Sequence, residues 1–421
     1  MLKEKILHRG EQESLFNSFE EPIPPLRFDI QSFPIEQDGE QYLYFYDSLN
    51  YATSNFTLPT DSETILSMLD GRRSIDDLIK LSTGEVSKND LLNYVRYLDE
   101  NGILYSQHFR KFSEHTELDY EQSRYHISNT AGISFPDSPN ELIDYLNAAF
   151  ANHENSDQQD ARALYAPHID PRVGLSSYVQ AFSSIKHLTP KKVFILATSH
   201  YSGMYGKQYD NFPFIISEKT FQLPNGSIEM HKNFRRMLSP KKWNQIGVSF
   251  NDRAHRVEHS IELHLLFLNH IWKHDFEIIP ILVGGMDELL YADESHKQAQ
   301  METFAAFLEE TYGDDPEAFF LISGDLSHFG KKFGDEEAAN TMFEDVESND
   351  RLFMQAGASG NPKHLLYMMK ENYDKYRICG FSPLMTFLTA FNGIEGKIIN
   401  YDVWDEKERE SAVTYGSILF N

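Results

Sequence analysis

The stretch Lys192-Val-Phe-Ile-Leu-Ala-Thr-Ser-His200 runs from an apolar segment directly into a polar motif that ends in histidine. Two other stretches have the same form, Ala163-Leu-Tyr-Ala-Pro-His168 and Ala318-Phe-Phe-Leu-Ile-Ser-Gly-Asp325. Short runs rich in β-branched and aromatic residues are typical of buried strands. If these strands are neighbours in one sheet, the two histidines and the aspartate gather at one rim, where open α/β sheets bind their ligands.

Strand-like and helix-like patterns alternate through the whole of residues 161–421. Further strand candidates are 276–283, 396–401 and 411–420, and helical periodicity marks 175–188, 260–272, 298–311, 335–355 and 383–391. Alternation of this kind is typical of βαβ units, in which helices cover the faces of a parallel sheet. The sequence therefore predicts an α/β domain with a mostly parallel, helix-covered sheet.

Residues 30–107 predict a small separate domain. An aromatic-rich strand at 41–47 precedes a helix that opens with capping-box spacing at Thr60-Asp-Ser-Glu63, and two more helices lead to a short strand after Asn101-Gly102. This order of elements is winged-helix-like. Residues 108–160 are polar with little periodicity, which predicts a linker that contains one helix from about residue 140 to 151.

Composition narrows the classes of function. A chain of 421 residues is too long for a domain with one hydrophobic core, which agrees with the prediction of two domains. The formal net charge of -26, from 38 Lys+Arg against 64 Asp+Glu, repels a phosphate backbone, so nucleic acid is not an expected partner. No apolar stretch reaches the roughly 18 residues of a membrane span, and a cytoplasmic location without membrane attachment is expected. The single cysteine excludes an internal disulfide.

The polar motifs have the makings of a metal site. Imidazole and thiolate bind iron, copper and zinc well, and the motifs supply them in His168, His200, His328 and Cys379. His259 and Glu262 are three residues apart at a predicted helix start and share a helix face, where they could support a metal-bound histidine or act as acid and base. The alternative is an exposed helix start at which the glutamate complements the helix dipole.

Part of the N-terminal domain resembles a known family of modules. Leu69-Asp-Gly-Arg-Arg-Ser-Ile-Asp-Asp-Leu78, followed later by Asn101-Gly-Ile-Leu104, resembles the PqqD-like modules that present precursor peptides to modifying enzymes. The resemblance implies a peptide partner; the alternative is a packing domain without a ligand. Binding of DNA is disfavoured, because residues 33–106 carry 5 Lys+Arg against 13 Asp+Glu.

The larger domain resembles the Memo family, also called AmmeMemoRadiSam system protein B. The motifs that carry the resemblance occur in order as Pro167-His168, Thr198-Ser-His200, Glu258-His-Ser-Ile-Glu262, Asp325-Leu-Ser-His328, Cys379-Gly380 and Ser411-Ala-Val-Thr-Tyr415. The resemblance implies the fold of the class III extradiol dioxygenases. It also implies one metal ion held by His168, His200 and Cys379, iron in the first place and copper or zinc as alternatives, with Asp325 and His328 in the same pocket.

The sequence departs from the family pattern after the first histidine. His168-Ile-Asp170-Pro-Arg172 stands where many members have small residues. Asp170 could accept a hydrogen bond from the His168 ring while Arg172 binds an anionic substrate, or the two could form a surface ion pair. A thiolate ligand is also softer than the carboxylate of the dioxygenases, so catechol cleavage is not carried over.

Three functional hypotheses follow. The first is a mononuclear metal redox protein that acts on a peptide or small substrate, with His328 and Asp325 moving protons and His259 and Glu262 supporting the ligands. The second is a non-catalytic metal-binding or peptide-binding scaffold that partners a radical enzyme. The third is a cysteine hydrolase in which Cys379 is the nucleophile, His328 the base and Asp325 the residue that orients it.

Overall fold

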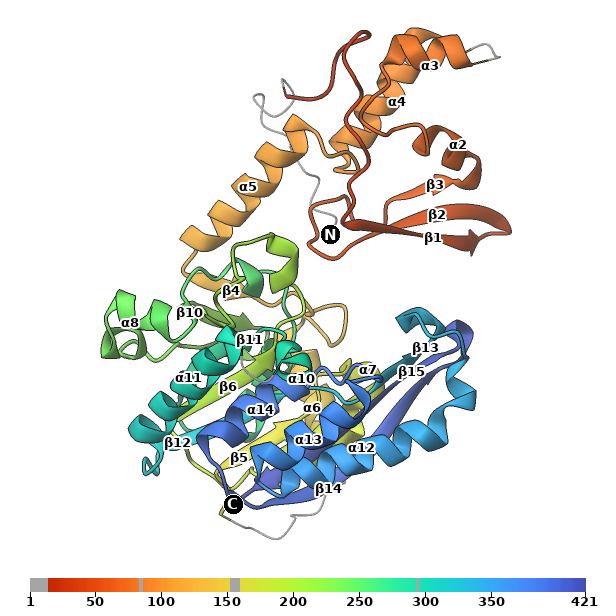
Figure 1. The fold of residues 1–421 in the computed structure, drawn as a ribbon. Helices are drawn as coiled ribbons and strands as arrows, with labels where there is room; N and C mark the ends of the chain where they lie inside the picture. Colours follow the sequence, from red (N-terminus) through yellow and green to blue (C-terminus); the bar gives the residue numbers. More distant parts are fainter. Residues whose placement is uncertain (1–13, 83–85, 152–159, 293–294) are drawn as a thin grey trace. The chain divides into compact units, whose positions relative to one another are not determined.

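The computed structural model divides into two compact units, Met1–Gln122 and Ser123–Asn421, which we call unit 1 and unit 2 (Figure 1). It describes residues 14–82, 86–151, 160–292 and 295–421. Each unit has its own hydrophobic core. No helix in these described ranges is long and apolar enough to cross a membrane.

Unit 2 is built on a central block of four parallel strands. They are β5 (Ala163–Ala166), β6 (Lys192–Thr198), β11 (Glu277–Val283) and β12 (Ala318–Ser323), and they lie side by side in the order β11-β6-β12-β5. All four are almost fully buried, as expected for strands that are covered on both faces. Their carboxyl ends lie at the same edge of the sheet. The predicted positions of these strands are confirmed.

Antiparallel strands extend the block on both sides. Next to β11 lies β7 (Phe214–Ile216), followed by β10 (Val248–Ser249). Next to β5 lies β15 (Ser411–Phe420), which also pairs with β13 (His328–Gly330) and β14 (Gly396–Glu406). A separate small sheet contains β4 (Tyr125–Ile127), β8 (Thr220–Leu223) and β9 (Gly226–Ile228).

Helices cover both faces of the central sheet (Figure 1). One face packs against α11 (His296–Tyr312), α12 (Phe343–Ala358), α13 (Pro362–Asn372) and α14 (Phe381–Ala390), and the other against α6 (Pro139–Phe150), α7 (Pro171–Ser183) and α9 (Glu262–Ile271). Side chains alternate along each strand, so Phe194 faces the first group of helices and Val193 and Ile195 the second. The fold is therefore the predicted helix-covered, mostly parallel α/β type.

Short helical elements complete the connections of the chain. They are α8 (Pro240–Gln245), α10 (Glu288–Tyr291), η1 (Thr60–Ser62), η2 (Ser202–Tyr205), η3 (Phe234–Met237), η4 (Arg253–His255), η5 (Lys331–Phe333), η6 (Ala339–Thr341) and η7 (Lys407–Arg409).

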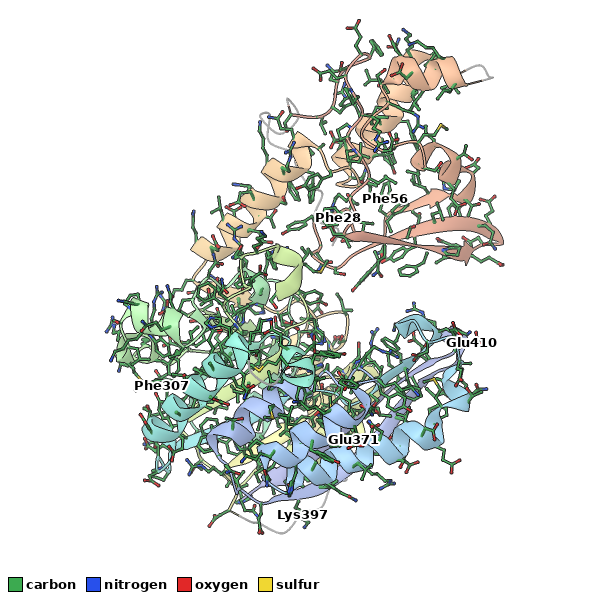
Figure 2. The ribbon with its side chains drawn as sticks, in the orientation of Figure 1. Phe28, Phe56, Phe307, Glu371, Lys397 and Glu410 are labelled. Carbon is green, nitrogen blue, oxygen red and sulfur yellow. The ribbon has the colours of Figure 1, made fainter. Side chains whose placement is uncertain are left out.

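Unit 1 combines a three-stranded antiparallel sheet with helices. The strands are β1 (Ile30–Gln37), β2 (Glu40–Asp47) and β3 (Thr57–Pro59), and the helices are α2 (Glu63–Leu66), α3 (Ile75–Leu81), α4 (Lys88–Glu100) and α5 (Gln107–Gln122). Ser74 and Asp77 form a capping box at the start of α3. Figure 2 labels Phe56, which is buried in this core, and Phe28, which is 88% exposed.

Two parts of unit 1 differ from the sequence prediction. Strand β1 was not predicted, and the short strand expected after Gly102 is only an isolated bridge between Leu26 and Leu104. The polar stretch expected to open a linker forms α5, which belongs to unit 1. Two buried residues fix α5 to the rest of unit 1: Phe109, and Glu117, whose carboxylate accepts from the Tyr51 hydroxyl at 2.5 Å. They are too far apart in the sequence to give a clear helical pattern of apolar residues. Helix α6 confirms the helix predicted from about residue 140.

A buried arginine organises the polar interior of unit 1. The Arg27 guanidinium donates from Nη1 to Asp47 Oδ2 and to Gly102 O, both at 2.9 Å, and from Nη2 to Asp29 Oδ2 at 2.8 Å. It also lies 4.1 Å from the centre of the Phe109 ring. Together with a bond from Nε to Asp29 Oδ1 at 3.0 Å, these contacts hold the side chain inside the unit.

Candidate metal centre

Three histidines from separate segments meet at the carboxyl edge of the central sheet. His168 follows β5, His200 follows β6, and His259 stands just before α9. One ring nitrogen from each lies within 4.8 Å of the others. The His200 and His259 rings are stacked with centres 4.9 Å apart, and His168 stands edge-on to both. The group could hold a metal ion.

The His168 ring is fixed by a serine at the end of β12. Its Nδ1 lies 3.0 Å from Ser323 Oγ, and the Ser323 hydroxyl donates to Ser260 O at 2.7 Å. Because the serine proton is committed to that carbonyl, Ser323 Oγ accepts from His168 Nδ1–H. The Nε2 atom of His168 then carries a lone pair, as a metal ligand requires.

The His200 ring is fixed by a buried carboxylate. Glu258 accepts from His200 Nδ1 at 2.9 Å and from the His200 backbone N–H at 2.8 Å. The same carboxylate accepts from the backbone N–H groups of His259 and Ser260, at 3.0 and 3.2 Å. Glu258 thus holds two of the three histidines in place, and it leaves Nε2 of His200 as the available donor atom.

The ionisation of the group follows from its surroundings. Burial lowers the pKa of His168 well below its ordinary value, and the neighbouring His200 lowers it further. Burial alone would lower the pKa of His200, but the Glu258 carboxylate and the Cys379 thiol raise it well above its ordinary value. The His200 side chain is 27% exposed, so its charged partners outweigh burial. Burial raises the pKa of Glu258, yet His200 more than offsets this and the pKa falls to about 2.

Cys379 lies next to the histidines because two glycines let the backbones approach. A Cβ atom on Gly324 would lie 2.2 Å from Gly380 Cα, so only glycine fits there. This approach lets Asp325 N donate to Cys379 Sγ at 3.2 Å, and it brings that sulfur within 3.4 Å of His168 Nε2. Burial raises the pKa of the Cys379 thiol. A ligand role for the thiol stays a prediction. The three ligand atoms that lie within 4.8 Å of one another belong to His168, His200 and His259, and Cys379 is not among them.

Asp325 and His328 follow β12 and approach the same group. Asp325 Oδ1 accepts from the backbone N–H groups of His168 and Ile169 at 2.9 and 3.1 Å, and its Oδ2 lies 3.8 Å from His168 Nε2. Burial raises the pKa of Asp325 to about 7. His328 Nδ1 is bonded to the carbonyls of Leu326 and Arg377. The hydrolase hypothesis requires Asp325 to orient His328, and the structure shows no such contact between the two residues.

Two expectations about neighbouring residues need correction. Glu262 does not contact the histidine rings through a hydrogen bond; its carboxylate accepts from the backbone N–H of Asn129 and from both the N–H and hydroxyl of Thr130. The supporting role expected for Glu262 falls to Glu258. Asp170 caps α7 and forms an ion pair with Arg172 at 2.7 Å, so the surface-pair alternative is correct and Ser323 orients His168 instead.

Sequence reasoning missed Glu258, Ser323 and Ser260. Glu258 is adjacent to His259 within the third family motif, and this adjacency was the available signal. Ser260 lies in the same motif, but its contact with Ser323 joins the end of β12 to the segment before α9 and could not be foreseen from spacing along the chain. The importance of the two serines depends on the order of strands in the sheet.

The donor set fits a resident metal ion. Two rings have their Nδ1 atoms committed to protein acceptors, and three nitrogens and a sulfur gather without a lysine or arginine among them. Histidine and cysteine donors suit iron, copper and zinc rather than magnesium or calcium.

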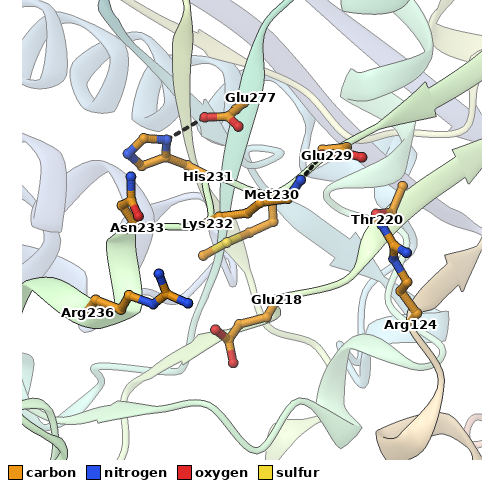
Figure 3. Close-up of a pocket in the computed structure, with 10 residues that line it drawn as sticks. All are labelled: Arg124, Glu218, Thr220, Glu229, Met230, His231, Lys232, Asn233, Arg236 and Glu277. Carbon is orange, nitrogen blue, oxygen red and sulfur yellow. Dashed lines mark hydrogen bonds and ion pairs between the residues drawn. The ribbon is translucent and has the colours of Figure 1, made fainter.

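A cavity lies at the other end of the sheet from the histidine group. It has a volume of about 530 Å³ and is lined by Glu277, the first residue of β11, and by residues around β9 (Figure 3). Its charged groups are mostly paired: His231 bonds to Glu277 and Lys232 to Glu229 (Figure 3). It contributes nothing to the histidine group, which follows the carboxyl ends of the strands.

Fold and site together define a helix-covered α/β protein with a histidine cluster suited to a metal at the carboxyl edge of its sheet. The family model described as Memo-like protein matches residues 127–419, nearly all of unit 2. The chain belongs to the Memo-like protein family, as the order of its motifs predicts.

Curated relatives agree with this assignment. A MEMO1 family protein of Aquifex aeolicus is 26% identical over 364 residues, which cover 85% of this chain and 90% of the relative. A MEMO1 family protein of Thermus thermophilus is 24% identical, with 79% of this chain and 94% of the relative covered. The Protein memo-1 homolog of Caenorhabditis elegans is 26% identical, with 71% and 78% covered.

Proposed function

We propose that this chain is a mononuclear metal redox protein whose ion is held by His168, His200 and His259, with the Cys379 thiol as an adjacent donor. The observation that carries the proposal is the close meeting of three histidine nitrogens, two of them on rings whose other nitrogen is already committed. Iron is the first expectation, with copper or zinc as alternatives. Bound iron or copper would supply one-electron redox chemistry and Lewis acidity at this edge of the sheet.

The surrounding residues would handle protons and orientation. Asp325, with a pKa raised by burial to about 7, can hold or release a proton close to His168. His328 presents its Nε2 as an acceptor, because Nδ1 is committed to carbonyls. Glu258 and Ser323 keep the rings of His200 and His168 oriented. These roles suit a small substrate or a peptide side chain that gives up a proton as it is oxidised.

Unit 1 would present a peptide to this site. The proposal rests on the resemblance to PqqD-like modules and on the edge strand β1, which pairs only with β2 among the described strands. Phe33 on β1 and Tyr46 on β2 are exposed aromatic side chains that a peptide could cover. Mass spectrometry of peptides that co-purify with the full chain, compared with Phe33→Asp, tests this part; peptides held equally by both would contradict it.

Metal analysis of variants tests the centre itself. Protein purified without chelator should carry about one metal ion per chain, and His200→Ala and His259→Ala should lose it. His231→Ala is the matched control, because His231 also pairs with a glutamate but lies at the far end of the sheet. Cys379→Ala should keep the metal with a changed absorption spectrum if the thiol is a donor. Full occupancy in both His200→Ala and His259→Ala would sink the proposed site.

Reactivity separates the redox role from its alternatives. Iron-loaded wild type should exchange electrons with a one-electron dye, and His259→Ala should not. A metal-bound protein that exchanges none would instead be a binding scaffold beside a radical enzyme. The hydrolase is not proposed, because Asp325 bonds to backbone amides rather than to His328, and because burial disfavours the Cys379 thiolate.

A further inference from the structure

The segment just before Cys379 has an unusual backbone. Tyr373, Asp374 and Arg377 have φ angles of 53°, 53° and 56°, in the left-handed region that side chains other than glycine rarely adopt. Aspartate tolerates this region, whereas tyrosine and arginine gain nothing from it. Such conformations persist where several contacts hold them, and they gather at functional sites.

The contacts that hold Arg377 are directed at His328. The Arg377 carbonyl accepts from His328 Nδ1 at 3.0 Å, and Arg377 Nε donates back to His328 O at 2.9 Å. The preceding carbonyl, of Tyr376, accepts from the His328 backbone N–H at 2.7 Å. Tyr376 and Arg377 together thus form hydrogen bonds to both the ring and the backbone of His328.

The guanidinium also fixes the loop that follows His328. Arg377 Nη2 forms an ion pair with Asp335, whose carboxylate accepts from the Gly330 backbone N–H at 2.8 Å. The planar guanidinium uses two different nitrogens for these two tasks, one for His328 O and one for Asp335. A lysine head group could keep the ion pair but would not reproduce the two-pronged geometry.

The hydrogen bonds at Nδ1 decide the tautomer of His328. Both acceptors at Nδ1 are carbonyls, of Leu326 and Arg377, and a carbonyl cannot donate. Nδ1 must therefore carry the proton, which leaves the lone pair on Nε2. Burial lowers the pKa of His328 to about 4, so the ring is neutral near pH 7. No hydrogen bond to Nε2 occurs among the described residues.

We propose that Arg377 is a positioning residue that holds His328 as a single tautomer, with Nε2 presented as a hydrogen-bond acceptor beside the histidine group. The consequence for the ligand is chemical: a molecule bound at this site meets an acceptor at Nε2 and must offer it an O–H or N–H. This inference rests on the proposed function, in which His328 moves protons. The competing explanation is that Arg377 only anchors the 330–335 loop through Asp335.

Nuclear magnetic resonance of the metal-free full chain labelled with nitrogen-15 histidine tests the proposal. The His328 signals are assigned by their loss in His328→Gln, and long-range proton–nitrogen spectra report which nitrogen carries the proton. Wild type should show only the Nδ1–H form. Arg377→Gln and Arg377→Lys should both show a mixture of tautomers, because each removes the bond from Nε to His328 O that holds the Arg377 carbonyl against the ring. Asp335→Asn should remain like wild type, because the bond from Arg377 Nε to His328 O is kept.

The outcomes separate the two explanations. Equal changes in Asp335→Asn and Arg377→Lys would mean that the loop, not the grip on His328, sets the tautomer. An unchanged His328 in both arginine variants would overturn the proposal. Metal content is measured in parallel and should stay at the wild-type level in all four variants. A wild type that binds no metal would contradict the proposed function, while the tautomer result would still stand or fall by itself.

Discussion

Unit 1 and the histidine group of unit 2 differ in how their buried polar side chains are hydrogen-bonded. In unit 1 the Arg27 guanidinium donates to Asp29, Asp47 and Gly102, and Asp47 further accepts from the backbone N–H groups of Leu49, Tyr51 and Ala52. In unit 2 the rings of His168 and His200 each bond one nitrogen to an oxygen acceptor, and the other nitrogen of His168 lies 3.4 Å from the Cys379 sulfur, itself a possible metal ligand. Both arrangements are ordered, but only the second leaves donor atoms for something that is not protein.

The difference teaches how to read a buried polar cluster. A network in which all groups are paired stabilises a fold, because each partner removed leaves an uncompensated charge. A cluster that orients its members from outside and leaves the inner atoms unpaired is built for a ligand. The two regions should therefore respond differently to substitution.

The largest expected effect is in unit 1. Arg27→Met leaves Asp47 buried without its cation, which should lower the free energy of unfolding of unit 1 by about 3–5 kcal/mol. Loss of hydrogen-exchange protection in α4 measures the effect, and the metal content of unit 2 should not change. Arg73→Met is the matched control: its ion pair with Asp70 is exposed to solvent, and its loss should leave the free energy of unfolding nearly unchanged. Equal destabilisation in the two variants would remove the contrast.

A glycine beside the metal centre should give the next largest effect. A Cβ on Gly380 would lie 2.1 Å from the Tyr165 hydroxyl oxygen and 3.0 Å from Asp325 O. Gly380→Ala should therefore cost about 1–3 kcal/mol of stability, as overpacking does, and change the absorption spectrum of the bound metal because Cys379 and Asp325 move apart. Gly203→Ala, with no atom within 4 Å of the new methyl group, is the control. Thermal unfolding and absorption spectra of both variants decide the matter; a Gly380→Ala protein equal to wild type would contradict this account of the backbone contact.

Two glutamates on one motif sharpen the comparison further. Glu258→Gln should weaken metal binding by about 10–100-fold, because the ring of His200 loses the carboxylate that orients it. Glu262→Gln should leave metal affinity unchanged, since Glu262 serves the Asn129–Thr130 loop. Competition with a chromophoric chelator measures both affinities. If Glu262→Gln is as damaging as Glu258→Gln, the assignment of the supporting role to Glu258 is wrong.

The smallest effect is one of pH. The pKa of His200 is raised, so the metal-free ring is protonated below that pKa and its ion pair with Glu258 then stabilises the fold; this contribution fades as the pH rises through it. A metal ion must displace the same proton, so its affinity should rise by up to about tenfold per pH unit until the ring is neutral. Calorimetry in buffers of different ionisation enthalpy should detect about one released proton per ion. Binding without proton release would show that His200 is neutral beforehand.

Much of unit 2 could be predicted from sequence. The runs at 163–166, 318–323 and 411–420 coincide with β5, β12 and β15, because strands buried on both faces leave an unbroken apolar pattern. His168 and His200 could be placed for the same reason, since each follows such a strand within three residues. Short strands such as β7 and β13 were not foreseen, because three residues give too little periodicity.

The composition of the site was harder to predict than its position. Spacing along the chain suggested that Glu262 accompanies His259, since i and i+3 share a helix face. In the structure His259 lies before the first turn of α9, so that spacing does not apply and the adjacent Glu258 reaches the rings instead. The segment just before α9 also places a ring nitrogen of His259 close to those of His168 and His200.

The sequence by itself determined the α/β alternation, the edge at which the chemistry gathers and the family to which the chain belongs, because buried strands and ordered motifs are local patterns. Only the tertiary structure decided which nitrogen of each histidine is committed, which carboxylate holds His200, and that Arg377 grips His328. These are contacts between segments up to about 160 residues apart in the chain, as with Ser323 and His168. They depend on strand order and backbone approach, which no local pattern records.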